Sequence, residues 1–262
     1  MTRNKNNRYV AALWVLPVVL AVVVGGSLVA TVATSRDGTA IVPVVGAVVG
    51  LLAVLGFSLG ARRRVERAFL QRGPDALLRA LRPAQSSMIP DAAAWGAYFE
   101  AWSLTLYGEF ERARAALDRV EWSRRPQVVR AAAMSVEVLL CFFDTRDFTQ
   151  GFNLARSARA TADISANFPG AKAALNSYDS LVEIGRALTD SPRPDTLENL
   201  AAHARNLPFG ARLIAMWGLA AAYDRAGDPT SADDTIARCR ELAPHCAPLR
   251  SLPRPASVGS AS

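Results

Sequence analysis

The sequence predicts an all-α protein in which two membrane-spanning helices precede a larger helical domain. Residues 9–35 and 38–61 contain no charged side chain. At about 1.5 Å per residue, either run is long enough to cross the roughly 30 Å hydrocarbon core of a bilayer. From residue 91 to residue 249, alanine and leucine dominate over β-branched residues, and no extended polar-apolar alternation occurs. Both features favour helices over strands.

Composition divides the chain into five segments. These are a lead at 1–8, a transmembrane helical hairpin at 9–61 with spans at about 10–33 and 40–61, basic juxtamembrane helices with a linker at 62–90, a helical domain at 91–250, and a tail at 251–262. Only Arg36 and Asp37 separate the two apolar runs, so the chain must turn straight back. The tail is rich in proline, serine and alanine, a composition typical of disorder.

The formal net charge of +7 is concentrated around the predicted spans. Residues 1–67 carry eight basic and two acidic side chains, a net +6, which leaves +1 for residues 68–262. The helical domain therefore lacks the basic excess typical of nucleic-acid binding. Arginine greatly outnumbers lysine, which indicates a bacterial genome rich in GC. Because basic residues beside short membrane-flanking segments stay in the cytoplasm, we expect a multi-pass protein of the inner (plasma) membrane with both termini cytoplasmic.

A cleaved signal peptide is the alternative for residues 1–34. It fits less well, since the first apolar run exceeds the usual length and a second follows at once. The second span carries small residues that form a seam for close helix packing: Gly46, Gly50, Ala53, Gly56 and Gly60. Either the first span packs on this seam, or two copies of the chain associate through it as a homo-oligomer. The basic residues that follow are Arg62, Arg63, Arg64 and Arg67; they determine topology or contact anionic lipid headgroups.

Glycine and proline breaks divide the helical domain into about eight helices. The breaks lie at Gly108, Pro126, 169–170, 192–194, 208–210 and 227–229. Short loops between helices predict antiparallel neighbours. Two stretches also share their intervals: Ala101, Gly108, Ala113 and Pro126 in the first, and Ala220, Gly227, Ala232 and Pro244 in the second, with one residue of difference at the closing proline. Tyr223 adds an aromatic residue before the second glycine.

This pattern resembles the tetratricopeptide repeat (TPR) family, whose signature has small residues in both helices, an aromatic before the turn and a terminal proline. The resemblance implies a TPR-like α-solenoid of about four helical hairpins, whose concave face binds a peptide or protein segment. Taking Ala113, Gly151, Leu197 and Ala232 as equivalent points gives spacings of 38, 46 and 35 residues, against a family period near 34. A non-repeating helical bundle is the alternative architecture.

Candidate chemistry is sparse along the whole chain. Cys239, His245 and Cys246 could supply metal ligands, but Cys239 occupies a repeat packing position and no second pair completes a site. His203 is expected on a helix face. Cys141 is the remaining cysteine, and three cysteines form no disulfide framework, which fits a reducing cytoplasm. Sequence signatures of nucleophilic or nucleotide-binding sites are missing. We therefore expect neither enzymatic activity nor a cofactor.

Aromatic residues provide the candidate partner contacts. Those from Trp95 to Tyr107 are too many for one narrow stripe, so most should be core, but Trp95 or Tyr98 could line the concave surface. Trp122 with Arg124 and Arg125 forms a second candidate patch. The leading hypothesis is a membrane-anchored adaptor or scaffold that binds an unknown protein or peptide segment. The alternative is a structural or regulatory membrane protein that acts through self-association of its transmembrane helices.

Overall fold

The computed structural model describes residues 60, 62–81, 91–163, 171–190 and 192–252. The chain forms two compact units, Met1–Arg64 and Val65–Ser262. The predicted spans and the seam through Gly46, Gly50, Ala53 and Gly56 lie outside the described residues; Gly60, at the end of that seam, is helical. Within the described ranges, no helix has both the length and the hydrophobicity needed to cross a bilayer.

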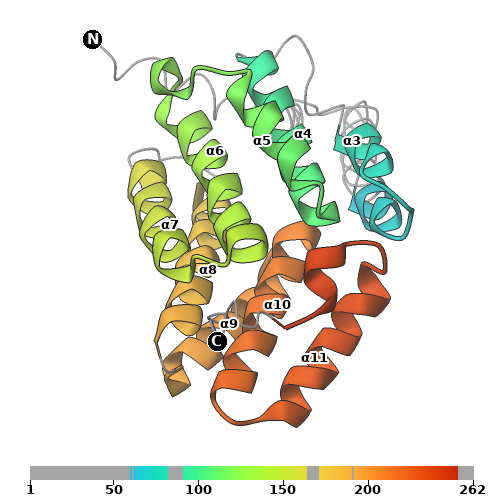
Figure 1. The fold of residues 1–262 in the computed structure, drawn as a ribbon, viewed down its shortest axis with the longest axis vertical. Coiled ribbons are helices and arrows are strands. Elements are labelled where there is room, and N and C mark those ends of the chain that lie inside the picture. The colour runs from blue at the N-terminus through green and yellow to red at the C-terminus, as the bar shows by residue number, and fades with distance from the viewer. Residues whose placement is uncertain (1–59, 61, 82–90, 164–170, 191, 253–262) are drawn as a thin grey trace, which may run out of the picture. The chain divides into compact units, whose positions relative to one another are not determined.

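Every regular element in the described ranges is helical, which confirms the all-α prediction (Figure 1). Residues 62–69 are helical. They are followed by α3 (Asp75–Leu81), α4 (Ala92–Tyr107), α5 (Phe110–Asp118), η2 (Trp122–Arg124), α6 (Gln127–Leu140), η3 (Cys141–Thr145), α7 (Phe148–Asp163), α8 (Ala171–Thr189), α9 (Pro194–Asn206), α10 (Phe209–Arg225), α11 (Pro229–Leu242) and η4 (Ala247–Arg250). The segment η3 is a π-helical turn that continues α6.

The predicted breaks that lie within the described residues fall at helix ends, for clear physical reasons; the break at 169–170 lies outside them, and the sequence does not predict the break between η3 and α7. Gly108 and Gly227 have φ angles of 83° and 82°, a left-handed conformation that glycine adopts without steric cost. The residue after each glycine closes the same turn: Glu109 N donates to Leu104 O and Asp228 N donates to Tyr223 O, both at 2.9 Å. Proline at the first position starts α9 and α11, where its missing N–H costs nothing.

Successive helices pair as α4 with α5, α6 with α7, α8 with α9, and α10 with α11. The four residues taken as equivalent in the sequence, Ala113, Gly151, Leu197 and Ala232, each occupy the fourth position of the second helix in a pair. In the first, second and fourth pairs, the residue two positions before the second helix has a positive φ angle. These residues are Gly108, Arg146 and Gly227. The unequal spacings therefore reflect different helix lengths around one shared hairpin register.

The small residues of the two matching stretches lie where helices approach closely. Ala101, Ala113, Ala220 and Ala232 are fully buried. Tyr223 is half-buried at the edge of the main core. Pro244 follows α11 and is also half-buried. Contacts between the first helices of successive pairs, α4 with α6, α6 with α8 and α8 with α10, stack the pairs in chain order.

The first helix of the last pair, α10, is covered rather than exposed, which the repeat pattern does not predict. Most of α10 is buried, including Trp217 at 1% exposure. Phe209 of α10 packs against Phe69, with ring centroids 5.3 Å apart, and Trp217 packs edge-on to Phe143 at 4.8 Å. Phe69 and Leu77 are fully buried in the same core. Residues 65–81 thus pack with the helical unit, while the sequence leaves open whether the juxtamembrane helices run along the membrane or cap the domain.

The end of the unit also closes on its beginning. The segment η4 contacts both α4 and α10, and a Cβ on Gly108 would lie 3.6 Å from the Cβ of Ala247. Trp217 Nε1 donates a hydrogen bond to Ser251 O at 3.0 Å. The first residue of the predicted disordered tail is therefore held in place, while residues 253–262 lie outside the described residues.

Candidate protein-interaction surface

Three aromatic side chains gather on the N-terminal half of α4. Trp95, Tyr98 and Phe99 have the i, i+3, i+4 spacing that places side chains on one helix face. The ring centroids of Trp95 and Tyr98 are 5.7 Å apart at 81°, and those of Tyr98 and Phe99 are 4.9 Å apart at 55°. All three side chains remain half-buried. We call these three residues the α4 aromatic face.

The next turn of α4 is covered by α10. Trp102 packs edge-on to Phe69 at 6.3 Å. A Cβ on Gly210 would lie 2.4 Å from Cη2 of Trp102, so only glycine permits this approach of α10 to α4. The aromatic run of α4 is thus divided: its C-terminal part joins the core, and the α4 aromatic face stays accessible.

Hydroxyl groups from three helices converge near the α4 aromatic face. Burial raises the pKa of Tyr98 to about 12, although a hydrogen bond with Ser135 of α6 opposes the shift. Burial also raises the pKa of Tyr178 on α8, and the neighbouring Tyr98 contributes to that shift. Both phenols therefore stay neutral at physiological pH. Because α4, α6 and α8 are the first helices of successive pairs, this polar and aromatic cluster spans three hairpins.

The start of α4 adds charged groups. Asp91 has a φ of 59° and forms an ion pair with Arg125, in which Nη1 lies 2.9 Å from Oδ1. Its carbonyl accepts a hydrogen bond from Trp95 N at 3.0 Å. Among the described residues, no hydrogen-bond partner is found for three buried polar atoms at this point: Asp91 Oδ2, Arg125 Nε and Trp95 Nε1. Trp95, Tyr98 and Arg125, which the sequence predicts as partner contacts, thus lie around one end of α4.

The other two predicted contacts lie elsewhere. Trp122 packs against the cluster formed by α4, α5 and α6, and its Nε1 donates to Leu117 O at 2.8 Å. This side chain closes the corner between α5 and α6. Arg124 is exposed and pairs with Glu121 at 2.8 Å. The geometry therefore separates the predicted patch: Arg125 joins the α4 aromatic face, while Trp122 is used in packing.

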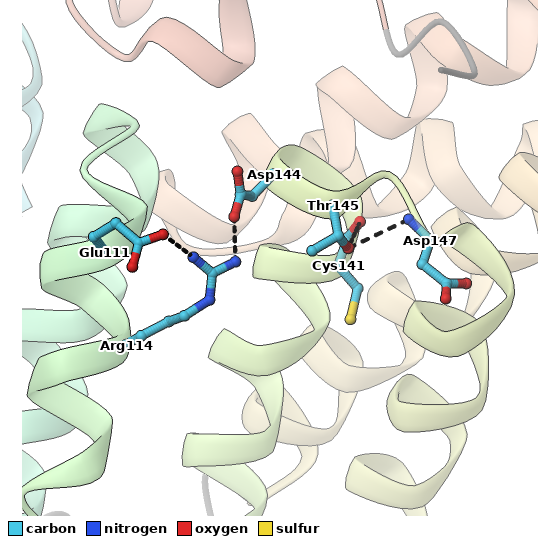
Figure 2. A network of polar contacts seen from close by, with 6 residues as sticks. All are labelled: Glu111, Arg114, Cys141, Asp144, Thr145 and Asp147. Carbon is cyan, nitrogen blue, oxygen red and sulfur yellow. Dashed lines mark hydrogen bonds and ion pairs between the residues drawn. The ribbon is translucent and has the colours of Figure 1, made fainter. Parts of the chain in front are cut away.

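A polar network joins the first hairpin to the second (Figure 2). Arg114 of α5 donates to Glu111 at 2.8 Å and also pairs with Asp144 in the π-helical turn. These two ion pairs raise the pKa of Arg114, with the Asp144 hydrogen bond as the largest cause. In the same turn Thr145 Oγ1 donates to Cys141 O at 3.4 Å. Sequence reasoning misses this network because Arg114 and Asp144 lie 30 positions apart.

The remaining candidate residues serve packing. Burial raises the pKa of the Cys239 and Cys246 thiols to about 12, and both side chains are fully buried. Burial likewise raises the pKa of Cys141 and lowers that of His203. Such shifts disfavour the thiolate that nucleophilic chemistry or metal binding needs. In the described ranges no three acidic, cysteine or histidine side chains are grouped in a way that could hold a metal ion.

Sequence reasoning finds part of this surface. The spacing of the α4 aromatics is visible in the sequence, but the sequence does not distinguish Phe99 from the aromatic residues of the core. Tyr178 and Ser135 carry no local signal, because only helix stacking brings them near Tyr98. Comparison with known proteins yields no match: no family model, curated protein or solved structure corresponds to this chain.

Proposed function

We propose that residues 65–252 form a protein-interaction module and that residues 9–61 tether it to the membrane. In this proposal the protein is an adaptor or scaffold without enzymatic activity, and its partner is a protein or peptide segment. The observation that carries the proposal is the α4 aromatic face. Three large rings stay half-buried on a helix whose following turn is almost entirely buried.

The side chains of the α4 aromatic face suit a binding role. Aromatic rings bury much area with few rotatable bonds, and tryptophan and tyrosine are enriched among residues that dominate binding energy. The rings of Trp95, Tyr98 and Phe99 contact one another, so they are held before a partner arrives. The ion pair between Asp91 and Arg125 lies beside them. The surface thus combines a preorganised apolar centre with polar groups at one end.

The shared hairpin register supports the TPR-like reading of the module. Four helix pairs stack in chain order, and equivalent packing residues recur at the same place in each second helix. Stacked helical pairs present side chains of successive first helices on a common face. Tyr98 and Tyr178, both half-buried, come from two such first helices, while Ser135 of a third is buried.

Photo-crosslinking in native membranes tests this proposal. The aromatic photo-crosslinker benzoylphenylalanine replaces Phe99, and the matched control places it at Asn199, an exposed position on α9. We expect a protein adduct of defined mass from position 99 only, and we expect Tyr98→Ala to weaken it. Truncating a dominant contact typically costs about 2 kcal/mol or more, roughly 30-fold in affinity. The same adducts from both positions, or no protein adduct from position 99, would refute the α4 aromatic face as the binding surface.

Self-association through the seam of the second span is the competing proposal. Replacing Gly50 and Gly60 by isoleucine would block close helix approach. If the protein adduct from position 99 persists in that variant, partner binding does not depend on the seam. If the oligomer and the adduct disappear together, self-association is the primary function.

A further inference from the structure

We propose that the turn following residues 62–69 is a second membrane contact, which seats the helical unit on an anionic lipid surface. The contact consists of Arg67, Leu70 and Arg72, here called the basic turn. This inference rests on the membrane tether of the proposed function. It goes further, because it states how the helical unit meets the bilayer.

Leu70 carries the first part of the argument. Its side chain is 53% exposed, and among the described residues no other large hydrophobic side chain is so exposed. A single exposed leucine is ordinary on a protein surface, so its neighbours decide its meaning. Arg67 and Arg72 on either side are also exposed. An apolar side chain between two guanidinium groups matches the layered chemistry of a membrane surface, where acyl chains lie beneath anionic headgroups.

The basic turn is held in its outward orientation by the core. Phe69, the residue before Leu70, is fully buried. The hydroxyl of Tyr107 on α4 donates to the carbonyls of Ala68 and Gln71, each at 3.2 Å. Gly73, with a φ of 83°, then reverses the chain into α3. Because these contacts fix the backbone on both sides, Leu70 cannot turn inward without breaking them.

The position of the basic turn in the chain and the charge around it indicate an anionic membrane as the partner. The predicted second span ends at residue 61, and residues 62–69 are helical. Only nine residues separate Leu70 from the predicted end of the span, so the chain cannot carry it more than roughly 30 Å from that end. Residues 62–81 contain six arginines and two acidic residues, Glu66 and Asp75, a net charge of +4. A surface of this sign favours anionic phospholipids over neutral ones.

Fluorescence quenching in reconstituted vesicles tests the inference. The full chain carries Leu70→Cys labelled with an environment-sensitive fluorophore; the natural cysteines are buried, so the label is selective. The matched control is Glu198→Cys on exposed α9. Vesicles contain phosphatidylcholine alone or with phosphatidylglycerol, plus a lipid whose acyl chain carries a quencher. We expect quenching at position 70 in anionic vesicles, loss of that quenching with Arg67→Gln and Arg72→Gln, and none at position 198.

Each other outcome overturns a defined statement. If the chain floats with the vesicles but position 70 is not quenched, the basic turn does not touch lipid and the tether stands. If quenching is equal in neutral and anionic vesicles, or survives both arginine substitutions, recognition of anionic lipid is refuted. Equal quenching at positions 70 and 198 refutes a specific contact. If the chain does not float with the vesicles at all, the tether itself fails, and this inference fails with it.

Discussion

Replacing Gly218 by alanine tests whether the close approach of α8 and α10 holds the last hairpin in place. A Cβ at residue 218 would lie 2.3 Å from Cγ1, 2.9 Å from Cδ1 and 3.2 Å from Cβ of Ile184. Ile184 is fully buried, and its branched Cβ leaves few rotamers in a helix. The isoleucine cannot swing aside, so α8 and α10 must separate or their backbones must shift.

The free energy of unfolding should fall in this variant. Overpacking a core costs about 1–3 kcal/mol, and three short contacts with a stiff side chain indicate the upper end. Alanine recovers about 1 kcal/mol through its higher helix propensity. We therefore expect a net loss of about 2 kcal/mol. Gly96→Ala is the matched control: no atom lies within 4 Å of a Cβ at that position in α4, so only the propensity gain of up to about 1 kcal/mol remains.

Urea unfolding of the full chain in detergent micelles measures both variants. Tryptophan fluorescence includes a signal from α10, because Trp217, one of the five tryptophans, lies in that helix and contacts Phe143. From most to least stable, we expect Gly96→Ala, then the unchanged chain, then Gly218→Ala. The slope of the unfolding free energy against urea concentration should be the same for all three. If Gly218→Ala proves as stable as Gly96→Ala, the close packing of α8 on α10 does not stabilise the unit and the reasoning fails.

Three further predictions concern single contacts. Gly227→Ala places a side chain on a residue with a φ of 82° and should cost about 1 kcal/mol in thermal unfolding, although the site has open space around it. Arg114→Ala with Asp144→Ala in a double-mutant cycle should give a coupling energy of at most about 1 kcal/mol, since both side chains are about one-third exposed; a much larger value would contradict that screening. Burial holds the pKa of Tyr98 at about 12, so the folded state keeps a proton that the unfolded chain loses above about pH 10. The contribution of Tyr98 to stability should be complete below about pH 10 and be lost as the pH rises toward 12, and Tyr98→Phe should lessen that part of the fall in alkaline unfolding curves.

Local sequence signals account for the helices and their ends. Gly108, Gly227 and the prolines that start α9 and α11 act through backbone geometry, which depends little on distant residues. The matching intervals around Gly108 and Gly227 are likewise visible in the sequence. The π-helical turn after α6 is not visible in this way, nor is the ion pair between its Asp144 and Arg114 of α5.

The candidate surface shows the same division. Trp95 and Tyr98 are identifiable as aromatic residues one helical turn apart, but the sequence does not tell which aromatics of α4 are covered. Gly210 decides this, because it lets α10 approach Trp102 and leaves the preceding turn uncovered. Trp122 is also half-buried, and the sequence does not tell that its indole N–H donates to Leu117 O.

The amino-acid sequence by itself determined the helical class, most of the helix breaks in the described residues and the concentration of positive charge near the predicted spans. Each of these follows from neighbours within a few turns of chain or from simple composition. Only the tertiary structure decided that residues 65–81 join the core, that α10 is buried on most sides, and which aromatic rings remain accessible. Those outcomes depend on contacts between residues more than a hundred positions apart, such as Phe69 with Phe209, and the pattern of either partner alone does not encode them.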